Sequence, residues 1–244
     1  MLRHKPRNDK FGFTLAEVLI TLGIIGVVAA LILPTLIQNY QKQATATSVK
    51  KAYNELNQII DRAKADYGDP SGWDYYESDE LPKWVQTYIE PYIKVVESGQ
   101  CGTSYQCMGI NPIFPLYQTG NDTITKRCNG YLIKTIGSSI ALRFYRYGGS
   151  FSNMTRVYVY IKNPKYPKSG KDIFYFEFDK SNPDKGFSTL YSSVDRDDLL
   201  EAGHVYAGDC VKTEKFSAGN WIIGDTCPTV IMQDGWKISK DYPW

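Results

Sequence analysis

The first 67 residues carry two hydrophobic patterns, one after the other. Between Phe13 and Leu33 almost every residue is apolar, and Glu17 is the only ionisable side chain. As an α-helix, this run of 21 residues would be about 31 Å long, which matches the roughly 30 Å hydrocarbon core of a bilayer. The pattern therefore predicts a membrane-spanning helix that contains one carboxylate.

Beyond Pro34, apolar residues recur at helical spacing among polar ones. The apolar stripe comprises Val49, Ala52, Tyr53, Leu56, Ile59, Ile60, Ala63 and Tyr67. Such a stripe is typical of a helix that packs one face on a core. We expect one long helix over residues 13–67 that ends at Gly68-Asp69-Pro70. We also expect a kink or local melting at Pro34, because proline has no N–H for the Ala30 carbonyl.

The rest of the chain predicts a second helix, an irregular loop and several strands. An apolar stripe from Leu81 to Ile93 predicts an amphipathic helix with Asp79 as its N-cap and an interruption at Pro91. Residues 97–130 combine cysteine, glycine and proline and are typical of a disulfide-stapled loop. Strand patterns occupy 131–136, 139–147, 155–162 and 172–179. Short helices are expected over 195–203 and from Thr226 to Gly235.

These elements together predict an α+β fold. We expect at least three or four antiparallel strands packed on the amphipathic half of the long helix.

A basic segment precedes the apolar run. It contains four cations against one anion: Arg3, Lys5, Arg7 and Lys10 against Asp9. By the positive-inside rule, this excess favours a cytoplasmic N-terminus. A carboxylate just inside a membrane span costs a few kcal/mol and is seldom left without a partner. Because the apolar run follows Gly12 directly, a cut there would leave Phe13 as a new N-terminus, whose amine is a natural partner for Glu17.

This arrangement resembles the N-terminal signature of type IV pilins and type II secretion pseudopilins. The match comprises a short basic leader ending in Gly12, then Phe13-Thr14-Leu15, Glu17 four residues after Phe13, an apolar helix and Pro34. The resemblance implies cleavage between Gly12 and Phe13 by a prepilin peptidase on the cytoplasmic face, N-methylation of Phe13 and assembly into a filament. It also implies that Glu17 contacts the Phe13 amine of a neighbouring subunit.

The resemblance further implies the organisation, location and partners of the chain. It divides the chain into a leader (1–12), a transmembrane and assembly helix (13–34), an amphipathic helix half (35–68) and an extracytoplasmic α+β domain (69–244). Implied partners are the prepilin peptidase, other pilin or pseudopilin subunits and an inner-membrane assembly platform. The subunit would cross the inner membrane once before assembly, with its N-terminus in the cytoplasm, and afterwards belong to a periplasmic or cell-surface filament.

Two simpler interpretations explain less of the segment. A plain single-pass anchor accounts for the length of the apolar run but not for Glu17 or Gly12. An ordinary secretory signal has a shorter apolar region with a small-x-small cleavage site after it, whereas here the small residue precedes the run.

The charge balance depends on the leader. The formal net charge is +2, but the chain without residues 1–12 has 24 basic and 25 acidic side chains. A global basic field that would attract nucleic acid is therefore absent, and only a local patch could do so.

Five cysteines follow the predicted span: Cys101, Cys107, Cys128, Cys210 and Cys227. In an extracytoplasmic, oxidising compartment we expect disulfides, and an odd count leaves at least one thiol unpaired if all bridges are intramolecular. A bridge between Cys210 and Cys227 would be worth about 3 kcal/mol in the chain-entropy model, and many pilins have a comparable C-terminal bridge. The other three cysteines compete for a second bridge.

The sequence contains few candidate catalytic or metal-binding residues. Once the leader is removed, His204 is the only histidine, and no GxSxG, HExxH, Walker A or GxGxxG motif surrounds it. Asp195, Asp197 and Asp198 are weak calcium candidates, but they lack the full calcium-loop pattern and helix capping explains them. We expect no cofactor and no enzymatic activity. Alternatives from other classes are a minor pilin acting as an adhesin or a DNA- or substrate-binding tip module, and a tethered hydrolase that uses His204.

Overall fold

The computed structural model describes residues 12–74, 81–102, 107–111, 130–137, 139–146, 154–201, 210–211 and 224–244. The chain divides into two compact units, Met1–Gln41 and Lys42–Trp244. Helix α1 (Leu15–Tyr67) begins in the first unit and ends in the second.

The part of α1 in the first unit continues through Pro34 without a break. The local melting expected at this position does not occur, because one proline removes only a single backbone hydrogen bond from a long helix. Apolar helices tolerate such a loss.

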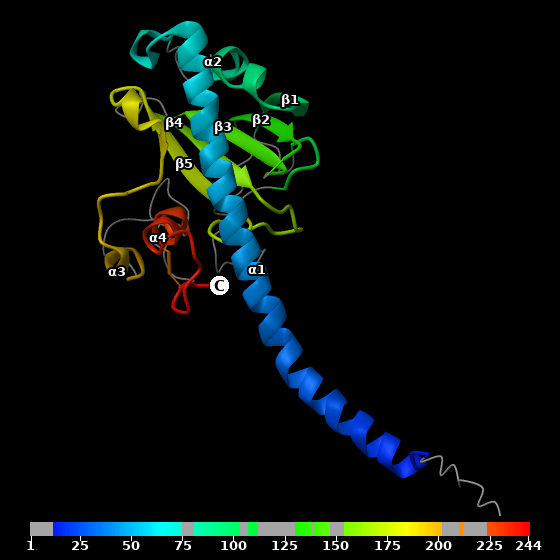
Figure 1. Ribbon diagram of the computed structural model, residues 1–244. Coiled ribbons are helices and arrows are strands. Elements are labelled where there is room, and N and C mark those ends of the chain that lie inside the picture. The colour runs from blue at the N-terminus through cyan, green and yellow to red at the C-terminus, as the bar shows by residue number, and fades with distance from the viewer. Residues whose placement is uncertain are drawn as a thin grey trace, which may run out of the picture. The chain divides into compact units, whose positions relative to one another are not determined.

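The second unit is built around a six-stranded antiparallel sheet whose strands follow one another in sequence order (Figure 1). The strands are β1 (Val95–Cys101), β2 (Gly130–Thr135), β3 (Ala141–Arg146), β4 (Met154–Tyr160), β5 (Ile173–Asp179) and β6 (Phe187–Ser188). With α1 lying across one face of this meander, the unit has the pilin-like α+β architecture that the sequence predicts.

Strand β1 corrects one prediction. Residues 97–101 are not part of an irregular loop, because they pair with β2 in a register that joins Ser98 to Ile133 and Cys101 to Gly130. β1 is an edge strand that is largely exposed, so its side chains do not alternate between core and solvent. Without that alternation the sequence gives no strand pattern. The two-residue strand β6 is also absent from the predicted elements.

Within the second unit, α1 buries the predicted stripe. Its buried residues are Thr45, Ala46, Val49, Ala52, Leu56, Ile59, Ile60 and Ala63. Helix α2 (Leu81–Tyr88) buries Leu81, Trp84, Val85 and Tyr88, and the 3-10 turn η3 (Glu90–Tyr92) contains Pro91, where the interruption was expected. The expected N-cap, Asp79, lies outside the described residues.

The two faces of the sheet differ in chemistry. One face is apolar: Phe144, Val157 and Phe176 lie side by side on three strands, and the Phe176 ring is 5.7 Å from Tyr53 of α1. The other face is also buried but carries arginine and tyrosine side chains, which the strand patterns did not predict. Its members are Arg143, Tyr145, Arg156, Tyr158, Tyr160 and Tyr175.

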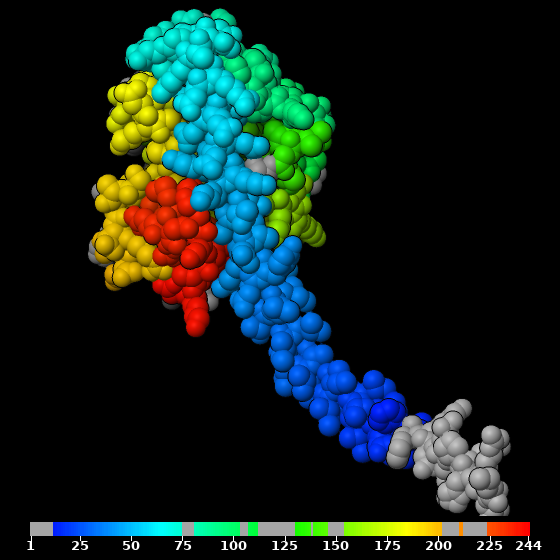
Figure 2. Space-filling view, in the orientation of Figure 1, coloured from blue at the N-terminus to red at the C-terminus, as the bar shows by residue number. Residues whose placement is uncertain are grey.

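Helices α3 (Arg196–Leu199) and α4 (Cys227–Gln233) complete the unit, together with the 3-10 turns η1 (Pro70–Gly72) and η5 (Pro183–Lys185). α3 is shorter than predicted, whereas α4 is followed by Gly235 in a left-handed conformation, with φ of 69°. Figure 2 shows the C-terminal segment, residues 224–244, beside α1, and the Trp236 ring lies 5.2 Å from Tyr53.

Candidate assembly segment and disulfide bonds

The residues before α1 form a reciprocal cap on the helix. The Thr14 backbone N–H and hydroxyl donate to Glu17 Oε2 at 2.8 and 2.9 Å, and the Glu17 N–H donates back to Thr14 Oγ1 at 3.2 Å. This is a capping box, which satisfies two backbone N–H groups at a helix start. The sequence predicted that the Glu17 carboxylate needs a partner. Its hydrogen-bond donors lie within its own chain.

Phe13 precedes this cap and is 88% exposed. Phe13 lies four residues before Glu17 in the sequence. Its backbone nitrogen is the atom that cleavage after Gly12 would turn into an amine. The structure thus places the predicted processing site, the cap and Glu17 in one short segment at the beginning of α1.

The first unit exposes an unusually apolar helix surface. An 18-residue window of α1 has a mean hydropathy of 2.6, none of the window is buried, and the helix is long and apolar enough to cross a membrane. The Thr21 hydroxyl donates a hydrogen bond to the Glu17 carbonyl at 2.9 Å, so this polar side chain has its partner within the helix. Gly23 and Gly26 have open space where a Cβ would be, which permits close approach of another helix.

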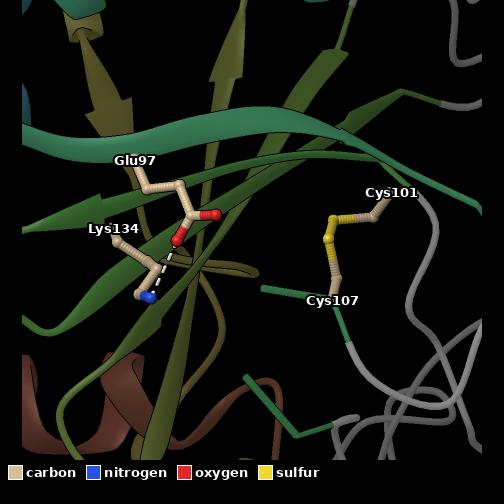
Figure 3. The surroundings of a disulfide bond; sticks show 4 residues. All are labelled: Glu97, Cys101, Cys107 and Lys134. Carbon is tan, nitrogen blue, oxygen red and sulfur yellow. Dashed lines mark hydrogen bonds and ion pairs between the residues drawn. A yellow bond between two sulfur atoms is a disulfide. The ribbon is translucent and has the colours of Figure 1, made fainter. Parts of the chain in front are cut away.

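Two disulfides join described residues of the second unit. Cys210 pairs with Cys227 with a Cα–Cα distance of 4.8 Å, and Cys101 pairs with Cys107 with a distance of 5.7 Å. Figure 3 shows the second bridge at one end of β1, with the Glu97–Lys134 ion pair further along the same strand. The fifth cysteine, Cys128, lies outside the described residues.

The Cys210–Cys227 bridge explains a glycine in the sequence. Gly170 has φ of 82°, and a Cβ at this position would lie 2.6 Å from the sulfur of Cys227. Only glycine fits both the conformation and the space.

The acidic cluster near α3 is used in local structure. Asp195 caps α3 by accepting a hydrogen bond from the Asp197 N–H at 3.0 Å, and Asp197 forms an ion pair with Arg196 at 3.0 Å. Asp198 lies in the first turn of α3. Over the described part of the chain, no group of three or more His, Cys, Asp or Glu side chains could hold a metal ion. His204 lies outside that part.

A cavity of about 300 Å³ lies in the second unit between α1 and the β2–β3 turn. Leu56 and Ile59 of α1 line it, together with Ile93, Ile136 and Leu142. Its lining contains one carboxylate, that of Glu55, and no histidine or cysteine.

Comparison with known families bears on both parts of the chain. Residues 35–244 match the model of a family of unknown function, DUF6613. The chain belongs to this family. Residues 7–33 match the model of the prokaryotic N-terminal methylation motif, which covers the cap, Glu17 and the apolar part of α1. No curated protein and no solved structure matches the chain.

The methylation motif and the long apolar helix together make the chain type IV pilin-like and indicate prepilin-type processing. This signature is that of a structural protein anchored in a membrane. Sequence reasoning identified these features but missed the Thr14–Glu17 box. The signal for it was present, since threonine followed three residues later by glutamate, before an apolar run, is the capping-box pattern.

Proposed function

We propose that this chain is a structural subunit of a type IV pilus or a type II secretion-type pseudopilus. In this proposal a prepilin peptidase cuts between Gly12 and Phe13, Phe13 is N-methylated, and the subunit assembles through the apolar part of α1. The observation that carries the proposal is the methylation motif over residues 7–33, which includes an apolar helix surface that no other described residue covers.

Burial of the exposed helix surface would drive assembly. In the membrane the surface contacts lipid, and in a filament it contacts neighbouring helices, where packing at small residues such as Gly23 and Gly26 replaces lipid contacts. Pro34 gives the helix a point at which a backbone hydrogen bond is already missing, so bending there costs little.

Glu17 would select the register of neighbouring helices. In the single subunit its carboxylate accepts two hydrogen bonds from Thr14, and none of the cations among the described residues forms an ion pair with it. Cleavage after Gly12 creates a positive amine on Phe13, and the amine of a neighbour can approach the carboxylate while the cap remains in place. Pairing with an opposite charge lowers the free energy of a charged group most in an apolar environment. Helix alignments that bring the Phe13 amine to the Glu17 carboxylate are therefore favoured.

The remaining parts of the proposal follow from this role. Residues 1–12 are the leader, 13–34 the assembly helix, 35–68 the amphipathic half and 69–244 the extracytoplasmic domain. The partners are the prepilin peptidase, other pilin or pseudopilin subunits and an inner-membrane assembly platform. The subunit begins in the inner membrane with its N-terminus in the cytoplasm and ends in a periplasmic or cell-surface filament, where it performs no enzymatic step.

Substitution of Gly12 tests the processing step. A Gly12→Leu variant should stay at full precursor length on a gel, because a bulky side chain blocks the small-residue position before the cut. The unsubstituted chain should yield an N-terminal peptide that starts at Phe13 and carries one methyl group on its amine, as read by mass spectrometry. Gly23→Leu is the matched control and should mature normally. Equal maturation of the Gly12→Leu chain would refute the cleavage site.

A further inference from the structure

The turn between β4 and β5 concentrates positive charge. Its residues 162–171, which we name the lysine loop, contain four cations and no acidic residue: Lys162, Lys165, Lys168 and Lys171. The next residue, Asp172, is only 8% exposed; burial raises the pKa of its carboxyl, whereas the Lys168 N–H and the charges of Lys162, Lys171 and Lys168 lower it. The loop is thus a local basic surface on a chain that, without its leader, has slightly more acidic than basic side chains.

The lysine loop is held in place by hydrogen bonds from three separate segments. Asn163 Oδ1 accepts from the Asn111 N–H at 2.9 Å. Ser169 donates its hydroxyl to the buried carboxyl of Asp225 at 2.8 Å, and the Tyr242 hydroxyl donates to a carbonyl of the loop. Because these contacts hold the backbone of the loop, the lysines extend from fixed backbone positions.

Aromatic rings accompany the lysines. Lys165 Nζ lies 5.2 Å from the centre of the Tyr166 ring, and Lys171 Nζ lies 5.3 Å from that of Trp244. None of the described residues forms an ion pair with Lys162, Lys165 or Lys171. Lysine beside tyrosine or tryptophan is the composition found where proteins meet the headgroup region of a bilayer.

The loop lies at the same end of the sheet as the β2–β3 turn, because the Ile140 N–H of that turn donates to the Tyr160 carbonyl at 2.8 Å. The second unit that carries the loop follows the segment of α1 that is long and apolar enough to span a bilayer.

We propose that the lysine loop, with Tyr166 and Trp244, is a docking surface for the anionic lipid headgroups of the membrane that holds the unassembled subunit. The inference rests on the membrane anchoring in the proposed function, but not on filament assembly. Docking would hold the domain against the bilayer until assembly lifts it away.

The membrane tether favours lipid headgroups over a soluble polyanion as the ligand of the lysine loop. Each lysine near an anionic membrane surface contributes modestly, so three of them shift the docked population by roughly tenfold to a hundredfold. The spanning helix keeps the loop at a high effective concentration near headgroups, which makes this weak attraction sufficient. A nucleic acid or other soluble polyanion has no such tether and meets a chain without a general basic field.

The test uses the full chain in lipid nanodiscs of phosphatidylcholine alone or with about one third phosphatidylglycerol, a composition that sets the surface charge. The rate at which a water-soluble acylating reagent modifies each lysine is followed by mass spectrometry. At low salt we expect Lys162, Lys165 and Lys171 to react on the order of tenfold more slowly in anionic discs, and high salt should remove the difference. Lys185, exposed near the opposite sheet end, is the internal control and should react equally in both.

Two double variants with the same loss of positive charge test whether the protection depends on the lysine loop or on net charge. Lys162→Gln with Lys165→Gln should abolish the protection of Lys171, whereas Lys180→Gln with Lys185→Gln, the same change in charge, should leave it intact. Equal rates in the two kinds of disc would overturn the proposal, and so would equal protection in neutral discs by added duplex DNA. Recovery of the chain with discs of either composition reports the anchoring by itself, so failure of anchoring and failure of docking are distinguishable.

Discussion

At the residue scale, the Arg196 side chain makes polar contacts with several separate segments. Its guanidinium donates to Asp234 at the end of α4, and to Ser239 and Asp241 in the C-terminal segment, with the latter two at 2.8 Å. It also pairs with Asp197 of its own helix at 3.0 Å. One side chain thus joins α3, α4 and the segment that ends beside the lysine loop.

This contact makes stability depend on pH. The Arg196 guanidinium, together with the Ser239 hydroxyl, holds the pKa of Asp241 well below its usual range. A carboxyl with a lowered folded-state pKa stabilises the fold above its unfolded pKa of about 4, and that stability is lost as pH falls from there toward the folded value. The side chain of Asp241 is 56% exposed, so solvent weakens the effect.

We therefore predict that Arg196→Met lowers stability at pH 7 by about 1–3 kcal/mol, because charged hydrogen bonds are lost while the aliphatic stem is kept. Urea unfolding between pH 7 and pH 2 measures this. The difference between the variant and the natural chain should shrink as pH falls below about 4, because Asp241 then binds a proton in the unfolded chain while the ion pair keeps it charged in the folded chain. A difference that stays constant over this range would contradict the assigned role of the ion pair. Lys240→Met, in the same segment, is the control.

Among the elements, α1 and β6 are joined in an unusual way. The Asn57 amide accepts from the Phe187 N–H at 2.8 Å and donates to the Phe187 carbonyl at 3.2 Å, as a neighbouring strand would. Gly186 has φ of 61°, and a Cβ there would lie 2.1 Å from Asn57 Oδ1. The helix thereby closes one edge of the sheet, while the other edge is the longer strand β1.

Replacement of Asn57 should loosen this edge. Asn57→Leu leaves the Phe187 N–H and C=O without their helix partner, which we expect to cost about 1–3 kcal/mol. The matched control is Asn54→Leu, an exposed position three residues earlier on the same helix, which should change stability by less than about 0.5 kcal/mol. Urea unfolding of both variants measures the difference, and equal stability would show that the Asn57 contacts contribute little.

The predictability of each element depended on its periodicity. α1 and the strands β2 to β5 were predictable because apolar residues on one side leave a repeat of 3.6 or 2 in the sequence. β1 was not, since its pairing uses backbone groups and most of its side chains are exposed. The buried Arg143 and Arg156 were also missed, because they alternate with apolar residues in the way that a solvent-facing side would. Their charges lie over the rings of Tyr160 and Tyr145, at 5.3 and 5.9 Å.

At the scale of the whole molecule, two units with different surfaces share one helix. The second unit buries its apolar residues in a core of its own, whereas the first exposes an apolar surface along its helix. This division was predictable, because an apolar run and an amphipathic stripe follow each other in the sequence. The edge contact of Asn57 was not, because it depends on the three-dimensional position of a single polar group.

The assignment of α1 as an assembly element depends most on Glu17. The most direct test measures how much of a Glu17→Ala subunit enters sheared filaments relative to the amount in the membrane fraction, with Asp61→Ala in the amphipathic half as control. We predict normal insertion and cleavage but on the order of a tenfold or greater loss from filaments, because the neighbour's amine finds no counter-charge. Entry of the Glu17→Ala subunit into filaments at the level of the control would contradict the assembly role.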